Sequence, residues 1–278
     1  MPRRVPTVLT MKDIIKICAK ATPATLAQSG VISSLRPAFS SKLRGKTLQC
    51  TFDSGAAGEY RLSTLENKLS WLDMDSVWHE EAYDCLESSV ENVFLVHYLR
   101  TDTDLTEAVT LVLDMNTSLV TRVEGTLGTV LSNRDVKRKV ESGYIGDRDP
   151  GTHHVKTDDM VGMILDWRFA QDVVIHAMYE TVQCCAFVSP PPAAAPDWYD
   201  FFITFNPARY RKIADQLYLI SFYAPGNSGM EAIMLMDLGR MRAVGAAFGI
   251  DITDTLRAYT FGAKGAYAPI GFIGCYTV

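Results

Sequence analysis

Three apolar runs decide the fold of this chain: VFLVHYL at residues 93–99, TLVLD at 110–114 and VTRVEGTLG at 120–128. The second half repeats them in the same order, as LYLISFY at 217–223, MLMD at 234–237 and MRAVGAAFG at 241–249. Short apolar runs separated by Gly, Asn, Asp and Ser are typical of strands joined by turns. A repeat of roughly 120 residues is too long for a solenoid unit, whose period is about 20 to 50 residues, so the pattern predicts a duplicated β domain.

The segments around these runs indicate how the two copies are bounded. LRGK at residues 43–46, ahead of the first copy, has a counterpart in MVGM at 160–163. Antiparallel modules of this size usually close into a barrel or sandwich, because closure removes exposed strand edges. We therefore expect an all-β chain with two tandem antiparallel barrels. The expected units are a leader helix at 1–35, a first barrel at 36–132, a polar linker at 133–157 and a second barrel at 158–278.

The leader segment is expected to form a short amphipathic helix. Met11, Ile14, Ile15 and Cys18 recur at helical spacing, and Thr10 is a suitable N-cap. Packing of this helix against a barrel end is favoured over any catalytic role.

Composition excludes several classes of function. Of 278 residues, 47% are hydrophobic and 21% charged, and the net charge of −5 argues against a nucleic-acid partner. No apolar run reaches the roughly 18 residues of a membrane helix, and no signal peptide is evident, so we expect a cytoplasmic protein without a membrane partner. The six cysteines include no CxxC pair, which favours buried reduced thiols. No cysteine cluster or phosphate-binding glycine loop is present, so we expect no metal and no cofactor.

The chain resembles the MoaF family, named for a molybdenum cofactor biosynthesis operon. The resemblance rests on residues 210–219, 234–238, 241–242 and 248–249 in the second half, and more loosely on Gly45-Lys46-Thr47, Tyr60-Arg61, Trp71 and 109–114 in the first. It implies an N-terminal and a C-terminal lipocalin-like (calycin-type) barrel. It says little about the reaction, because barrels of this kind include binders, cofactor-independent decarboxylases and cyclases, and fold does not imply function.

Two ionisable residues in apolar strands of the second half are the catalytic candidates. His176, within residues 173–180, could act as a general acid or base, or could be an ordinary hydrogen-bonded histidine. Glu231, within residues 229–235, is either functional or exposed at a strand edge, because an unpartnered buried carboxylate would cost several kcal/mol. The sequence does not decide which face of either strand points inward.

The substrate-binding candidates are aromatic or basic side chains. They are Trp78, His79, Trp167, Tyr179, Arg209, Tyr210, Tyr218 and Phe222. Arg209 and Tyr210 could anchor a carboxylate or phenolate. Trp78 and His79 belong to the group 78–83, which could be a mouth loop or a solvated turn. Tyr60, Trp71 and His97 could line a pocket, although core packing is the favoured role for them. Trp167 beside Arg168 could be a structural brace.

These features support two functional hypotheses. The first is a lyase, isomerase or cyclase that uses acid/base groups on a small hydrophobic, aromatic or polyene-like metabolite bound inside a barrel. A nucleophilic serine is not expected, because Gly226-Asn227-Ser228-Gly229-Met230 lacks the final glycine of a GxSxG elbow. The alternative is a non-catalytic carrier of the same ligand. A third, weaker option is a structural protein that forms a homodimer through its leader helix.

Overall fold

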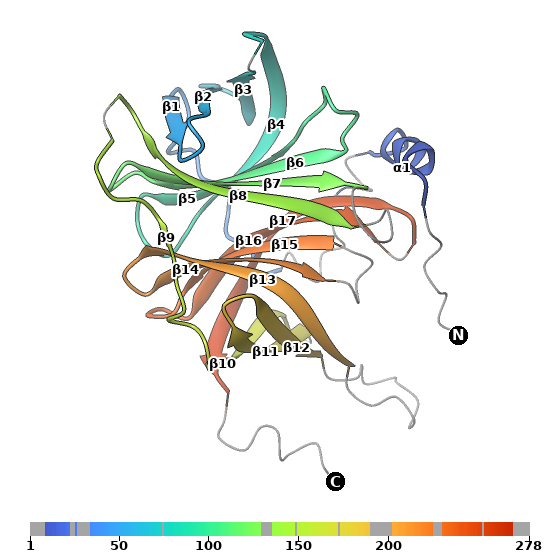
Figure 1. Ribbon diagram of the computed structural model, residues 1–278, viewed down its shortest axis with the longest axis vertical. Helices are drawn as coiled ribbons and strands as arrows, with labels where there is room; N and C mark the ends of the chain where they lie inside the picture. Colours follow the sequence, from blue (N-terminus) through green and yellow to red (C-terminus); the bar gives the residue numbers. More distant parts are fainter. Residues whose placement is uncertain are drawn as a thin grey trace.

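Two closed barrels of eight antiparallel strands each follow one another along the chain (Figure 1). The computed structural model describes residues 9–22, 26, 34–73, 75–128, 135–147, 149–171, 173–189, 202–224, 230–251 and 253–268. Helix α1 (Met11–Cys18) precedes the strands. The predicted all-β fold with two tandem barrels is confirmed.

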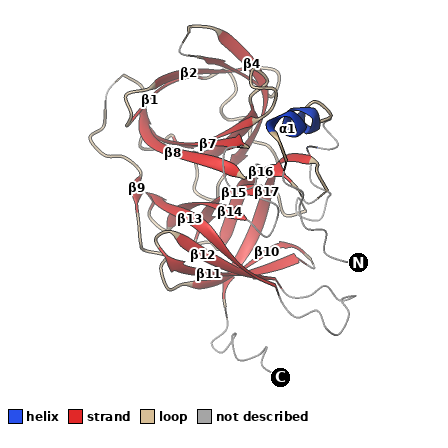
Figure 2. Cartoon of the chain, turned by 45° about the vertical axis from the view of Figure 1, so that its right-hand side comes forward, coloured by secondary structure: helices blue, strands red, loops and turns tan. Residues whose placement is uncertain are grey.

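The first barrel uses its strands in chain order, each hydrogen-bonded to the next. They are β1 (Thr47–Phe52), β2 (Ala57–Leu62), β3 (Lys68–Leu72), β4 (Trp78–Glu87), β5 (Val93–Leu99), β6 (Glu107–Asp114), β7 (Leu119–Leu127) and β8 (Val136–Ile145). Residues 143–145 of β8 pair with residues 50–52 of β1 and close the ring, which Figure 2 shows from its side.

The second barrel has the same topology. Its strands are β10 (Ile164–Ala170), β11 (Val173–Thr181), β12 (Cys184–Ser189), β13 (Phe202–Ala214), β14 (Leu217–Ala224), β15 (Met230–Asp237), β16 (Arg242–Ile250) and β17 (Leu256–Tyr267). Pairing of residues 165–168 with 264–267 closes this ring. The short strand β9 (Val155–Lys156), from the connection between the barrels, adds to β13 at Arg211 and Lys212.

The repeated runs of the sequence occupy equivalent strands. Residues 93–99 form β5 and residues 217–223 lie in β14, while the following runs lie in β6 and β7 and in β15 and β16. The segments at 43–46 and 160–163 also match, since Gly45 (φ +74°) and Gly162 (φ +87°) both adopt the left-handed conformation just before the first strand of their barrel. Glycine takes this conformation without the steric penalty of a Cβ atom.

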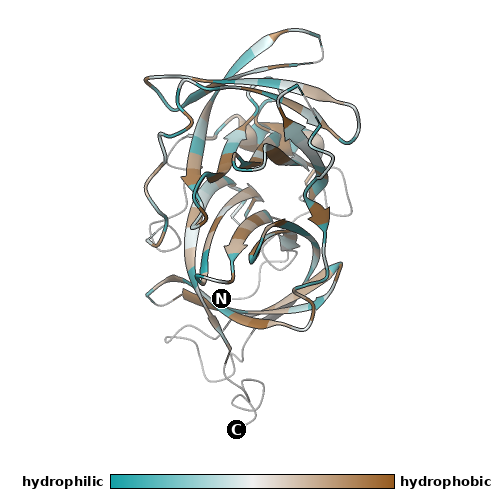
Figure 3. Ribbon diagram, turned by 90° about the vertical axis from the view of Figure 1, so that its left-hand side faces the viewer, coloured by the Kyte–Doolittle hydropathy of each residue, from teal (hydrophilic) through white to brown (hydrophobic). Residues whose placement is uncertain are grey.

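The central strands are buried on both faces. Phe94 and Val96 of β5 point into the first barrel, whereas Val93 and Leu95 pack against Leu219 and other residues on the outer face of the second. Figure 3 shows the two barrels one above the other, so each covers part of the other's outer surface. Burial of both faces explains why these runs are continuously apolar rather than alternating.

The boundary between the barrels differs from the sequence prediction. The polar segment expected as a linker at 133–157 contains β8, the closing strand of the first barrel. Its charged residues face charged residues of β7, with Glu141 opposite Arg122 and Lys139 opposite Glu124. Cross-strand pairs of opposite charge stabilise a sheet. Because β8 carries such charged residues, its composition resembles that of a linker although it forms a strand. The connection therefore begins at about residue 146.

Helix α1 packs where the two barrels meet. Thr10 caps it through a capping box with Asp13, in which the side chain of each residue bonds the backbone N–H of the other. Ile14 and Cys18 on its buried face join a core with Leu127 of β7 and Phe248 of β16. The helix thus contacts both barrels (Figure 1).

Candidate functional site

The interiors of the two barrels differ in polarity. The core of the second barrel consists of aromatic, aliphatic and methionine side chains. At its centre the Trp167 indole donates a hydrogen bond to the Tyr179 hydroxyl (2.9 Å), which in turn donates to the Met236 sulfur (3.3 Å). The first barrel, in contrast, carries charged side chains on the inner faces of several strands. These side chains are the groups that could take part in acid/base chemistry.

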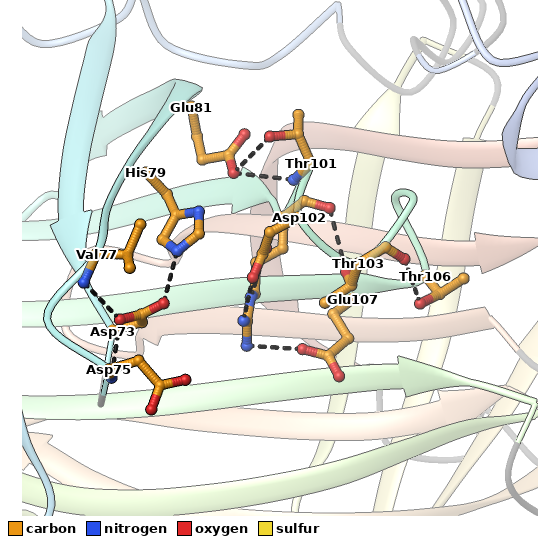
Figure 4. A network of polar contacts seen from close by, with 11 residues as sticks. Asp73, Asp75, Val77, His79, Glu81, Thr101, Asp102, Thr103, Thr106 and Glu107 are labelled. Atoms are coloured by element: carbon orange, nitrogen blue, oxygen red, sulfur yellow. Dashed lines mark hydrogen bonds and ion pairs between the residues drawn. The ribbon is translucent and has the colours of Figure 1, made fainter.

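Five of these inward-facing residues gather at one end of the first barrel. They lie on β3, β4 and β6 and directly after β5, and we call this group the polar end: Trp71, His79, Glu81, Arg100 and Glu107. Figure 4 shows His79, Glu81 and Glu107 of this group. Trp71 and His79 are opposite each other in the sheet register. Their rings are stacked, with centroids 4.5 Å apart and planes inclined by 19°.

A turn holds His79 in place. Nε2 of His79 lies 2.8 Å from Oδ2 of Asp73, and Oδ1 of Asp73 accepts hydrogen bonds from the backbone N–H groups of Asp75 and Val77 (Figure 4). The hydrogen bond from His79, followed by that from Val77, lowers the pKa of Asp73. A carboxylate at this position favours a hydrogen on Nε2, which leaves Nδ1 as an acceptor when the ring is neutral.

Glu81 is the buried carboxyl group of the polar end. It is 3% exposed, and its Oε1 accepts hydrogen bonds from the backbone N–H (2.9 Å) and hydroxyl (3.0 Å) of Thr101. Burial raises the pKa of Glu81, and the hydrogen bonds from Thr101 only partly oppose this effect. A raised pKa makes the protonated carboxyl group more accessible, which suits a group that accepts and donates protons.

Arg100 lies beside these groups, and two acidic side chains balance its positive charge. Its guanidinium group binds Asp102 (2.6 Å) and Glu107 (2.8 Å), and its Cζ lies 4.5 Å from the centroid of the Trp71 ring. Cation–π contact and two ion pairs together fix the position of the guanidinium.

A second charged layer extends from β7 and β8. Arg122 pairs with Glu141 (2.6 Å) and Glu124 (3.2 Å) and covers the ring of Phe52. Burial alone would raise the pKa of Glu141, but hydrogen bonds from Arg122, Ser54 and Lys139 lower it to about 2. Burial raises the pKa of the neighbouring Tyr60 to about 12. This layer is a fixed ionic support.

The sheet opens sideways next to the polar end. Residues 60–62 of β2 pair with residues 69–71 of β3, but the described residues 57–59 have no partner on β3. A pocket of about 590 Å³ lies there, lined by residues 57–59 and by Asp73, the partner of His79, among others. The Tyr60 ring packs closely against Gly58, where a Cβ atom would lie 3.2 Å from it. We call this pocket the lateral opening.

The two residues predicted to be catalytic do not share a site. His176 lies on the outer face of β11, where Nδ1 is 2.6 Å from Oδ1 of Asp166 on β10. Glu231 lies on the outer face of β15, between the barrels, with Oε1 3.8 Å from Nε of Arg138 on β8. Their strands are separated by three others in either direction around the ring. Neither side chain faces the interior of the second barrel.

The residues predicted to bind substrate fall into three groups. Trp167, Tyr179, Tyr210, Tyr218 and Phe222 lie in the core of the second barrel. Arg209 points outward from β13 and, with Tyr210, lines a separate surface pocket. Trp78 is also on an outer face, with the guanidinium of Arg61 3.9 Å from its ring centroid. His79 is part of the polar end.

Sequence reasoning named some residues of the polar end but missed others. Residues 78–83 form strand β4, not a loop, and alternation places His79 and Glu81 on its inner face. Trp71 was a candidate for pocket lining. Arg100 and Glu107 were not singled out, and neither was Arg122 of the neighbouring charged layer. The alternation of Arg122 and Glu124 with uncharged residues along β7 is a signal that places both on one face of the strand.

Two kinds of feature are absent from the described part of the chain. Among the described residues, no group of three or more His, Cys, Asp or Glu side chains is arranged to hold a metal ion. None of the helical segments described has the length and apolar character needed to cross a membrane.

Comparison with known proteins gives one family match. Residues 25–129, which include β1 to β7 of the first barrel, match the MoaF N-terminal domain. No curated protein matches the chain. The resemblance seen in the sequence is therefore confirmed for the first barrel.

Proposed function

Because its first barrel is similar to a MoaF N-terminal domain, which names no reaction, we propose a function from the site itself. We infer that the polar end of the first barrel binds a small aromatic or conjugated molecule and transforms it by acid/base chemistry without a cofactor. The reaction class is that of a lyase, isomerase or cyclase. This proposal places the catalytic groups in the first barrel, whereas the catalytic candidates from the sequence, His176 and Glu231, lie in the second.

The observation that carries the proposal is the position of Glu81. Its buried carboxyl group sits on the same inner face of β4 as His79, two residues away, and shares the polar end with Trp71 and Arg100. A carboxyl group of raised pKa can accept a proton from, or donate one to, a substrate in a site that excludes water. His79, held by Asp73, supplies a second group for proton transfer on the same face.

The aromatic stack supports an aromatic or conjugated ligand. Trp71 and His79 present flat rings, and offset stacking of a further ring is worth about 0.5–1.5 kcal/mol beyond area burial. Arg100 provides positive charge next to the indole, where negative charge developing on a phenolate or enolate would be stabilised. The lateral opening, which Asp73 also lines, has a size suited to a small molecule.

The first test identifies the ligand and then measures turnover. Native mass spectra of the protein from its source, compared with denatured spectra, would reveal a co-purifying small molecule. The released compound would be incubated with fresh protein and followed by chromatography and mass spectrometry. Conversion of the compound supports catalysis, whereas unchanged compound that still binds supports the carrier function instead.

A pair of neighbouring carboxylates on β4 allows a matched mutational test. Glu81→Gln should reduce turnover by roughly 10²- to 10⁴-fold, the usual contribution of a general acid or base. Glu80→Gln is the control, because Glu80 points outward, is 59% exposed and pairs with Lys68. Equal turnover in the two variants would contradict the assignment of Glu81.

A further inference from the structure

A second pocket lies on the outside of the second barrel, at a gap beside β13. Strand β12 covers residues 202–207 of β13, and β9 covers residues 211–212. Between them, residues 208–210 have no partner strand on that side among the described residues. A pocket of about 430 Å³ fills this gap. Its lining residues are Lys156, Thr157, Asp158, Val182, Gln183, Arg209 and Tyr210.

Two positively charged side chains converge on this pocket from different elements. Lys156 comes from β9 and Arg209 from β13, and both are exposed. Within the described part of the chain, neither has an acidic partner at ion-pair distance. The only hydrogen bond of the Arg209 side chain to the described residues runs from Nη1 to the carbonyl oxygen of Ala208 (3.0 Å). Several N–H donors of Arg209 thus have no described protein acceptor.

The surroundings of the pocket are also basic, although the whole protein is acidic. Arg211, opposite Lys156 in the register, donates its hydrogen bonds to neutral oxygens of Ser142, His154 and Val140. Arg138 donates a hydrogen bond to the carbonyl oxygen of Pro207. Burial lowers the pKa of Arg138, the charge of Glu231 opposes this effect, and the charge of nearby Arg209 lowers the pKa further. Asp158 is the acidic residue in the lining.

We propose that this pocket is a binding site for an oxyanion, the phosphate or carboxylate group of a small molecule. Lys156 and Arg209 supply charge-assisted hydrogen bonds, Thr157 and Gln183 supply neutral donors, and the pocket volume suits a small ligand around the anionic group. The site lies on the second barrel, away from the polar end of the first, so it extends beyond the proposed reaction.

Titration calorimetry of the full chain with inorganic phosphate and, separately, with acetate tests this site. The wild-type protein should bind at least one of the two anions. The anion that binds more tightly identifies the anionic group of the ligand as phosphate or carboxylate. Arg209→Gln and Lys156→Gln should each weaken binding by about tenfold or more, because each removes a charged donor. Asp158→Asn should tighten binding, because it removes a repulsive charge.

The control is Lys264→Gln, an exposed lysine on β17 of the same barrel that does not line the pocket. It should bind the anion as the wild type does. Far-ultraviolet circular dichroism would confirm that every variant keeps its β structure. Absence of binding of both anions to the wild type, or an equal loss in Lys264→Gln, would overturn the proposal.

Discussion

Glu231 is a buried carboxyl group between the barrels. It is 2% exposed, and its Oε2 lies next to Gly125 of β7, where a Cβ atom would come within 2.4 Å of it. Burial raises the pKa of Glu231 to about 8, and the charge of Arg138 only partly opposes this effect. Ionisation of Glu231 would place a poorly compensated charge where the two barrels approach each other at Gly125.

This raised pKa predicts how stability varies with pH. The folded-state pKa of about 8 exceeds the usual carboxyl pKa of 4.5, so between these values the folded protein binds more protons at Glu231 than the unfolded chain does. The free energy of unfolding should then fall as pH rises from about 5 to 8. In Glu231→Gln this fall should be reduced, which urea denaturation at several pH values would measure.

The exposed Glu80 again provides a control for this experiment. Glu80→Gln should keep the wild-type dependence of stability on pH, because Glu80 is 59% exposed. The comparison uses the slope of the free energy of unfolding against pH. The absolute stability is not compared, because loss of the contact with Arg138 changes it in Glu231→Gln at every pH. An identical slope in Glu231→Gln and the wild type would refute the role given to Glu231.

At the scale of single elements, α1 owes its ends to local sequence and its position to tertiary packing. A helix of eight residues is too short to be stable alone, so the capping box and the buried face must hold it. Thr10→Ala removes the side-chain oxygen that accepts from Asp13 N–H and the hydroxyl that donates to its carboxylate (2.6 Å). We expect a loss of about 1 kcal/mol in the stability of the helix.

Hydrogen exchange of a peptide covering α1 would measure this loss. The exposed Lys12 is the control residue, because Lys12→Ala keeps the cap and introduces a good helix former. Faster exchange in Thr10→Ala than in Lys12→Ala is the expected result. Equal exchange rates would mean that packing against Leu127 and Phe248 alone holds the helix.

The strands explain which parts of the fold and site were predictable. The repeat and the short apolar runs were sufficient to predict two barrels, because the repeated runs form strands at equivalent places in each ring, such as β5 and β14. The faces of these strands were not predictable, because residues 93–98 are all buried and show no alternation. The same ambiguity left the orientations of His176 and Glu231 undecided, and only tertiary structure places both on outer faces.

At the scale of the molecule, the contact between the barrels is itself a hydrophobic core. Leu86, Val93 and Leu95 of the first barrel pack with Leu219 and Leu235 of the second, together with other buried residues. A shared core of this kind removes the independence usual for two domains, whose interfaces tend to be more polar. The two barrels should therefore unfold together as one cooperative unit.

Leu235→Ala tests this coupling, because Leu235 is 1% exposed and lies in the shared core rather than in either barrel interior. The truncation should cost about 2–5 kcal/mol, the usual range for a buried leucine. Native-state hydrogen exchange with mass spectrometry should show the same loss of protection in β3 of the first barrel and in β11 of the second, since both open only on global unfolding. Leu65→Ala, at a residue that is 84% exposed, should change neither strand. Loss of protection confined to the second barrel would mean that the first barrel is stable by itself and that the interface joins two independent folding units.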